Sequence, residues 1–370
     1  MEIFSSPSFF VTYAVIQTVI FLLLVRFLDL YEHEPFSLLA LMALWGAVGA
    51  TGISIFGNEV MADVISEDVY VVFGAAISAP VVEEFSKGLA LLLAFGLSSW
   101  AHRRFGSLEL HGVTDGIVYG AAIGLGFAFT EDIYYLLDSA AQEGLREGIV
   151  VFLRRRDFFG TGMLHHAIFT ATFGVGLGLA TWARSSIGRI TWALSGFLLA
   201  MLLHATNNGL VQLMLVRRFG FDATVDAVGS QEFTAPMAAT ISNTRQAMLI
   251  LDYAVAVAFF VGIALWLYHQ RKVIRAELAD EADSGLIDPR DGELVPSYFR
   301  RVLWYWQLAR IGELERVRAI RRLHIELAKL ALEKWVLRRR GGNPEAVTRS
   351  RQRVATLKAQ GAVDVYAPSV

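Results

Sequence analysis

The residues best able to do chemistry in this sequence are carboxylates and histidines that interrupt long apolar runs. The stretch APVVEEFSKG places Glu83 and Glu84 about one helical turn before Lys87. A charge inside a membrane-spanning helix costs about 3 kcal/mol on insertion scales, so such groups usually face the bundle interior and mark a functional site. Glu83 and Lys87 are four residues apart and share a helix face, so the lysine can neutralise one carboxylate while the other stays available as a general base. Pro80 and the small residues before it could open this helix and admit water.

Three further apolar segments carry groups of the same kind. They are, in chain order, Glu131 and Asp132 in GFAFTEDIYY, His165 and His166 in GMLHHAIFTATFG, and His204, Asn207 and Asn208 in LLHATNNGL. His204 and Asn208 are four residues apart, so they can address one ligand atom together. Successive membrane helices run antiparallel, which puts Glu131, near the end of one helix, at a depth similar to that of His166, near the start of the next. We therefore expect the four sets to converge in the half of the membrane nearer one surface.

Each group also has a purely structural interpretation. His165 and Asn207 are equally well explained by hydrogen bonds between helices, and Glu83 with Lys87 by a neutralised ion pair. We expect Asp132 to be solvated at a helix end and Asp252 to be structural. The glycines of GAAIGLGF and FGVGLGLA are expected to let helices approach closely without any ligand. The occurrence of chemically able groups in four consecutive segments is what favours a site.

Composition indicates how these residues are positioned. The chain has 370 residues, is 55% hydrophobic and 18% charged, and has a mean hydropathy of +0.47; soluble domains carry about 25% charged residues, so this balance is typical of a membrane protein. Seven segments are long enough to cross a bilayer as helices, near residues 9–28, 36–56, 69–98, 113–137, 162–182, 188–215 and 246–268. The predicted fold class is all-α: a polytopic membrane helix bundle of about seven transmembrane helices, with a C-terminal helical tail outside the membrane.

Charge and cysteine content exclude other classes. The net charge of −2 argues against a nucleic-acid partner, which requires a basic surface. The absence of cysteine removes thiolate chemistry and leaves histidines and carboxylates as the possible zinc ligands. Basic residues in short loops, and at the start of the tail, favour a cytoplasmic tail. Arg154, Arg155 and Arg156, in the connection after residue 137, argue against that orientation.

The tail leaves several interpretations open. Residues 298–306, YFRRVLWYW, alternate aromatics and arginines as an interfacial anchor would. The segment RRLHIELAKLALEKWVLRRR has Leu, Ile and Trp at helical spacing with basic flanks. It is compatible with a helix on an anionic leaflet, with a helix that pairs with a partner, and with a packed soluble hairpin.

Taken in order, the motifs VEEFSK, DGIVYGAAIGLGFAFTED, HHAIFTATFGVGLG and LLHATNNG resemble the PrsW family of intramembrane proteases, which is related to the CAAX-processing membrane glutamic proteases. The resemblance covers about residues 30–215. Together with the change to a polar sequence after residue 270, it leads us to expect a transmembrane protease domain over residues 1–270, followed by a cytoplasmic basic helical tail over 271–370. Carried over motif by motif, it assigns the site to Glu83, Glu84 and Lys87 (EExxK), Phe127 and Glu131 (FxxxE), His166 (beside His165), and His204 and Asn208 (HxxxN). The CAAX relatives have a histidine where this chain has Glu131, so their water-activating pair cannot be copied unchanged.

The resemblance implies hydrolysis of a peptide bond in or beside the bacterial plasma membrane. The family's known substrates are single-span anti-sigma factors, so the expected partners are a single-span membrane protein and the lipid bilayer. We expect a cofactor-free mechanism in which Glu83 or Glu84 takes a proton from water. In that mechanism His204 and Asn208 donate to the developing oxyanion.

Two alternatives remain. The first is a zinc metalloprotease with Glu83, His166 and His204 as ligands. The second is a transporter or scaffold that relays protons through Glu83 and Glu131 without cleaving anything.

Overall fold

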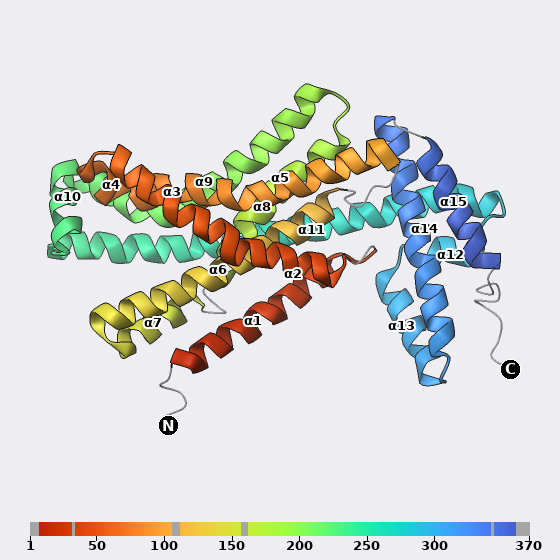
Figure 1. Cartoon of the computed structure of the whole chain (residues 1–370), viewed down its shortest axis with the longest axis horizontal. Helices are drawn as coiled ribbons and strands as arrows, with labels where there is room; N and C mark the ends of the chain where they lie inside the picture. Colours follow the sequence, from red (N-terminus) through yellow and green to blue (C-terminus); the bar gives the residue numbers. More distant parts are fainter. Residues whose placement is uncertain (1–6, 32–33, 106–111, 157–161, 342–343, 360–370) are drawn as a thin grey trace.

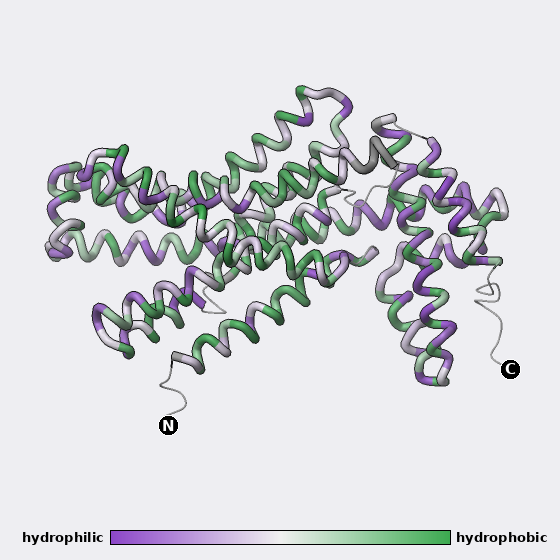
Figure 2. Tube along the Cα trace, in the orientation of Figure 1, coloured by the Kyte–Doolittle hydropathy of each residue, from purple (hydrophilic) through white to green (hydrophobic). Residues whose placement is uncertain are grey.

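The computed structural model of the chain describes residues 7–31, 34–105, 112–156, 162–341 and 344–359. Within these ranges the chain forms helices joined by short connections, with no strand. Long helices run side by side as a bundle, and a smaller group of helices, α12 to α15, lies at one end of it (Figure 1). The long helices are predominantly hydrophobic along their length, whereas the group at the end is more hydrophilic (Figure 2).

Six helical stretches within the described residues are long and apolar enough to cross a membrane: Ser8–Leu28, Phe36–Val64, Glu67–Trp100, Val113–Glu143, Ser186–Phe219 and Ala235–Asp283. The predicted all-α polytopic bundle is therefore confirmed. The remaining predicted span forms helix α8 (Gly162–Trp182), with the predicted bounds.

These stretches correspond to named helices. They are α1 (Pro7–Leu28), α2 (Phe36–Leu44) continuing through a π-helical segment (Trp45–Ala50) into α3 (Thr51–Val64), α4 (Glu67–Phe73) continuing through a second π-helical segment (Gly74–Ser78) into α5 (Ala79–Phe105), α6 (Val113–Glu143), α9 (Ser186–Phe219) and α11 (Ala235–Asp283). The second π-helical segment ends five residues before Glu83, in the stretch where Pro80 and small residues predict an opening of the helix. Such π-bulges are frequent at functional sites.

Helix α6 is the centre of the bundle, and α8 packs against it through glycines. A Cβ atom added to Gly116 would lie 2.0 Å from the Gly174 carbonyl oxygen, and one added to Gly124 would lie 2.2 Å from that of His166. The backbones of α6 and α8 can lie this close because glycine has no side chain, as the glycine pattern predicts. Neither position has room for a methyl group. This close approach brings the start of α8, with His166, against the middle of α6.

The tail has a hydrophobic core of its own. It consists of α12 (Pro289–Leu294), α13 (Tyr298–Arg310), α14 (Leu314–Arg340) and α15 (Pro344–Ala359). Leu323, Leu327 and Leu330 of α14 are buried in this core together with Ile274 of α11. The apolar face of α14 therefore packs within the tail. Of the three interpretations of this segment, the packed hairpin agrees with this contact. Helix α11 runs unbroken through residue 270, so its last turns belong to the tail core.

The contact between α6 and α8 can be tested with alanine substitutions. We expect Gly116→Ala to lower the unfolding temperature of the purified protein in detergent, because overpacking of this kind costs about 1–3 kcal/mol. Gly96→Ala in α5 is the matched control, since a Cβ there meets nothing within 4 Å. Equal unfolding temperatures for the two variants would contradict the packing described here.

Candidate active site

Lys87 lies at the centre of a buried cluster of charged and polar groups. Its Nζ atom donates to Glu84 Oε1 at 2.9 Å, to Glu83 Oε2 at 3.3 Å and to His166 Nδ1 at 3.0 Å. Glu83, Glu84 and Lys87 are all buried. An ammonium group has three N–H donors, and here each has a partner. The lysine therefore contacts both carboxylates, whereas the sequence predicted that it would pair with one.

His166 connects the lysine to Glu131. Because His166 Nδ1 accepts from the Lys87 ammonium, its Nε2 carries the proton and donates to Glu131 Oε2, 2.7 Å away. The ring of Phe127 lies beside both groups: its centroid is 3.8 Å from Lys87 Nζ and 5.2 Å from the centre of the His166 ring. The FxxxE motif thus places the Phe127 ring over the Lys87 ammonium and the Glu131 carboxylate within hydrogen-bonding distance of the His166 imidazole.

His204 in α9 completes the cluster on the side of Glu84. Its Nδ1 lies 2.9 Å from Glu84 Oε1, and its Nε2 lies 3.8 Å from Glu83 Oε2. The second oxygen of Glu84 accepts a hydrogen bond from Thr170 Oγ1 at 3.2 Å. Glu84 is therefore held by Lys87, His204 and Thr170. Among the described residues, the Glu83 carboxylate has a hydrogen bond from Lys87 alone.

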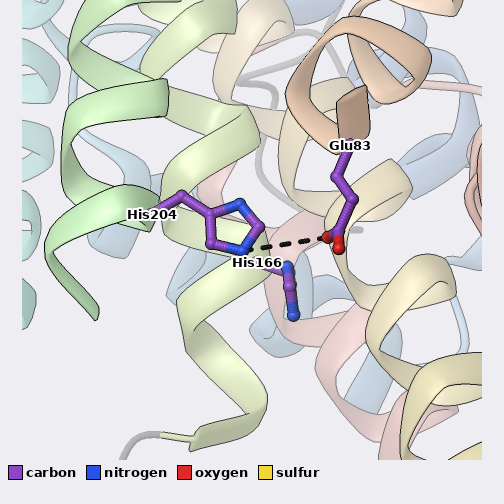
Figure 3. A group of neighbouring side chains, drawn as sticks. All are labelled: Glu83, His166 and His204. Atoms are coloured by element: carbon purple, nitrogen blue, oxygen red, sulfur yellow. Dashed lines mark ion pairs between the residues drawn. The ribbon is translucent and has the colours of Figure 1, made fainter. Parts of the chain in front are cut away.

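Glu83, His166 and His204 could also hold a metal ion. One ligand atom from each lies within 4.8 Å of the others, and all three residues are buried. They come from three different helices and point toward one another (Figure 3). These are the three ligands that the sequence predicts for the zinc alternative.

Of the two adjacent histidines, the cluster includes His166. His165 faces α11, with its Nε2 3.5 Å from Asp252 Oδ2 and its ring stacked on Phe169. Asn208, predicted to act with His204, instead accepts a hydrogen bond from Asn207 at 3.0 Å and is half-buried. The structure therefore brings His204 into the cluster and leaves the Asn208 amide outside its hydrogen bonds.

Asp132 contradicts the sequence expectation. It was expected to be solvated at a helix end, but it is 2% exposed and paired with Arg155 at 2.8 Å and Arg156 at 3.0 Å. Arg155 is the last residue of α7 (Leu145–Arg155), a short helix after α6, and Arg156 directly follows it. A buried carboxylate needs such partners because its desolvation is costly. Arg156 also donates to the carbonyl oxygen of Ala14 and so fastens α7 to α1.

Arg155 is a site residue that the sequence analysis missed. Its guanidinium lies 2.6 Å from Glu131 Oε2, the same oxygen that accepts from His166, and its side chain is 30% exposed. It therefore connects the buried cluster to the surface of the bundle. The run Arg154 to Arg156 was interpreted only as a topology signal. The sequence did contain a signal for this contact: the acidic pair Glu131 and Asp132 is followed, in the next connection, by the basic run Arg154 to Arg156.

Buried carboxylates and histidines gathered inside a polytopic helix bundle define a membrane-embedded site of the kind that intramembrane proteases use. The model of the PrsW family of intramembrane metalloproteases matches residues 34–228, which is more than half of the chain. The chain therefore belongs to the PrsW family and is an integral membrane protease. The resemblance predicted over about residues 30–215 is confirmed, and α11 to α15 lie outside the matched region.

A relative of the same name as the family supports this assignment. Protease PrsW from Geobacillus kaustophilus (strain HTA426) is 28% identical over 196 residues, which cover 52% of this chain and 74% of that protein. No solved structure matches the chain.

Arg155 can be tested against its neighbour. We expect Arg155→Gln to lower the rate of cleavage of a membrane-anchored reporter about 10- to 100-fold, the range typical when a group that orients a site residue is removed. Arg155→Lys should restore part of the rate because it returns the charge. Arg154→Gln is the control, since Arg154 is exposed. If Arg155→Gln and Arg154→Gln cleave equally well, the contact with Glu131 has no role in the reaction.

Proposed function

We propose that this protease hydrolyses a peptide bond of a membrane-anchored protein with water activated by Glu83. The observation that carries the proposal is the difference between the two neighbouring glutamates. Glu84 is held by Lys87, His204 and Thr170, whereas Glu83 receives one hydrogen bond within the described residues. A general base needs a free lone pair within reach of the water it deprotonates, and Glu83 has one.

The imidazole of His204 lies where it can assist Glu83. With its Nδ1–H donated to Glu84, the ring presents an unprotonated Nε2 3.8 Å from Glu83 Oε2. A water molecule hydrogen-bonded to both atoms would be oriented for attack on a substrate carbonyl. Glu83 then takes one proton from that water and passes it to the leaving amine nitrogen, so the products are a carboxylic acid and an amine.

The other members of the cluster act on charge and orientation. The Lys87 ammonium offsets the charge of Glu83 and Glu84, and the Phe127 ring covers it from one side. Asn208 lies one turn beyond His204, and we propose its Nδ2 as the donor to the oxyanion. The hydrogen bond from Asn207 uses the Oδ1 atom of Asn208 and so does not occupy this donor. Donors of this kind are typically worth about 2.7–4 kcal/mol each.

The zinc alternative has its own structural support. The donor types of Glu83, His166 and His204 fit zinc, and Glu84 and Glu131 contact the second nitrogen of each histidine, as carboxylates do beside metal-binding histidines. Bound zinc would act as a Lewis acid and lower the pKa of a bound water. Lys87 favours the metal-free mechanism, because its ammonium lies 3.0 Å from His166 Nδ1 and would have to leave that nitrogen.

The substrate and location follow from the family. We propose a single-span membrane protein as substrate, of the anti-sigma-factor type, in a bacterial plasma membrane with the tail on the cytoplasmic side. We also propose that residues 1–270 carry the protease activity and that residues 271–370 form a separate tail. The transporter or scaffold alternative is set aside because the chain belongs to a protease family.

The two glutamates should respond differently to the same substitution. We expect Glu83→Gln to reduce cleavage at least about 100-fold with little change in unfolding temperature, because few contacts depend on its charge. Glu84→Gln should also lose activity but should lower the unfolding temperature, since it removes the charge that Lys87 and His204 contact. Both quantities are measured on protein reconstituted with a membrane-anchored reporter. Full activity of Glu83→Gln would contradict the assignment of the base.

Metal content separates the two mechanisms. If Glu83 activates water unaided, the purified active protein should contain no stoichiometric zinc by mass spectrometry, and phenanthroline should leave cleavage intact. Loss of cleavage with the chelator, restored by added Zn²⁺ and abolished together with metal content in His204→Ala, would establish the zinc mechanism instead.

A further inference from the structure

Helix α13 of the tail is apolar on two opposite faces. Its inner face packs on the tail core: Leu308 is buried there, and Trp304 and Tyr305 are partly buried against it. Arg301 lies on the same inner face and is also buried. The contacts of α13 with the tail core are made by this inner face, which packs against α14.

The opposite face of α13 is apolar and exposed. Phe299 is 85% exposed, Leu303 55%, Trp306 54% and Val302 44%. Their spacing of three and four residues puts them on one side of the helix, and we call these four residues the outer stripe. Ile311, just after the helix, is 58% exposed and extends the apolar surface. Contiguous apolar surface of this kind marks an interaction site.

Two hydrogen bonds fix α13 at the boundary of the membrane-spanning bundle. Arg301 donates to the carbonyl oxygen of Leu30 at 2.7 Å, and the Tyr31 hydroxyl donates to that of Pro296 at 2.9 Å. Leu30 and Tyr31 follow directly after α1, which ends at Leu28. Helices α13 and α14 run across the end of the bundle, with α13 on the side toward α1 and α2 (Figure 1). Since the long helices cross the bilayer, α13 lies along its surface.

The charges of α13 suit an anionic surface. The helix sequence YFRRVLWYWQLAR contains three arginines and no acidic residue. Arg300 and Arg310 are exposed, and the Arg310 guanidinium lies 4.7 Å from the centre of the Trp306 ring. A basic helix with Trp, Phe and Leu on one face is the pattern of helices that lie in the headgroup region.

We propose that the outer stripe of α13 inserts into the lipid headgroup region of the leaflet next to the tail, and so docks the tail on the bilayer. The occupant of the stripe is lipid, because α13 is fixed where α1 leaves the membrane and carries arginines that attract anionic headgroups. The proposal does not depend on the mechanism of cleavage.

The absence of native cysteine allows a direct test on the full-length protein. A nitroxide spin label is attached at Leu303→Cys or Trp306→Cys, with Gln352→Cys on the exposed surface of α15 as control. The protein is placed at one copy per nanodisc of phosphatidylcholine and phosphatidylglycerol. We expect labels 303 and 306 to lie about 5–10 Å below the headgroups, accessible to oxygen and shielded from a water-soluble nickel chelate, while label 352 stays accessible to the chelate.

A second variant identifies what covers the stripe. When Phe299→Glu and Trp306→Glu are added, the label at 303 should become accessible to the nickel chelate, while circular dichroism shows unchanged helix content. Equal chelate access at 303, 306 and 352 in the first experiment would overturn the proposal. Shielding that persists after the two glutamates are introduced, or that appears only in discs with two copies, would show that protein and not lipid covers the stripe.

Discussion

The contact on which the rest of the site depends is the buried ammonium of Lys87. It lies among two carboxylates and an imidazole, and its three donors meet Glu83, Glu84 and His166. Two adjacent carboxylates could not both be charged in an apolar bundle without such a cation, because desolvation and their mutual repulsion oppose it. The lysine therefore lets the chain keep a pair of glutamates inside the membrane, with Glu83 held by fewer hydrogen bonds than Glu84.

That arrangement requires helices that are far apart in sequence to meet within hydrogen-bonding distance. Gly116 and Gly124 provide this by letting the backbone of α8 lie directly on α6. A larger residue at either position would push His166 away from Glu131 and from Lys87. Membrane helices gain little from burying apolar surface against one another, so close backbone packing between small residues is what fixes the distances in the site.

Much of this could be predicted from the sequence. The four-residue spacing of Glu83 and Lys87 predicted their shared face, and the antiparallel order of the helices predicted that Glu131 and His166 would meet. What failed depends on contacts between distant parts of the chain. Asp132 was expected in solvent because nothing local shows that α7 folds back to bring Arg155 to it.

Thr170 and Asn208 show the same limit at the scale of single side chains. Thr170 gave no signal, since threonines in membrane helices commonly bond within their own helix. In the structure its hydroxyl instead donates a hydrogen bond to Glu84. For Asn208, helical spacing shows which residues share a face, but the choice of partner depends on side-chain rotation.

Helix α11 relates the site to the tail. Its Asp252 contacts His165, the neighbour of His166, whereas its Ile274 lies in the tail core. Ile274 lies 22 positions after Asp252, a rise of about 33 Å along the helix, which is close to the thickness of a hydrocarbon core. The cluster therefore lies in the half of the membrane away from the tail, so the tail can supply no group to the reacting atoms. Helix α8 also joins the two parts, because it carries His166 and its Trp182 ring lies 4.8 Å from that of Trp335 in α14. An effect of the tail on cleavage can therefore reach the site through the position of α8 or of α11.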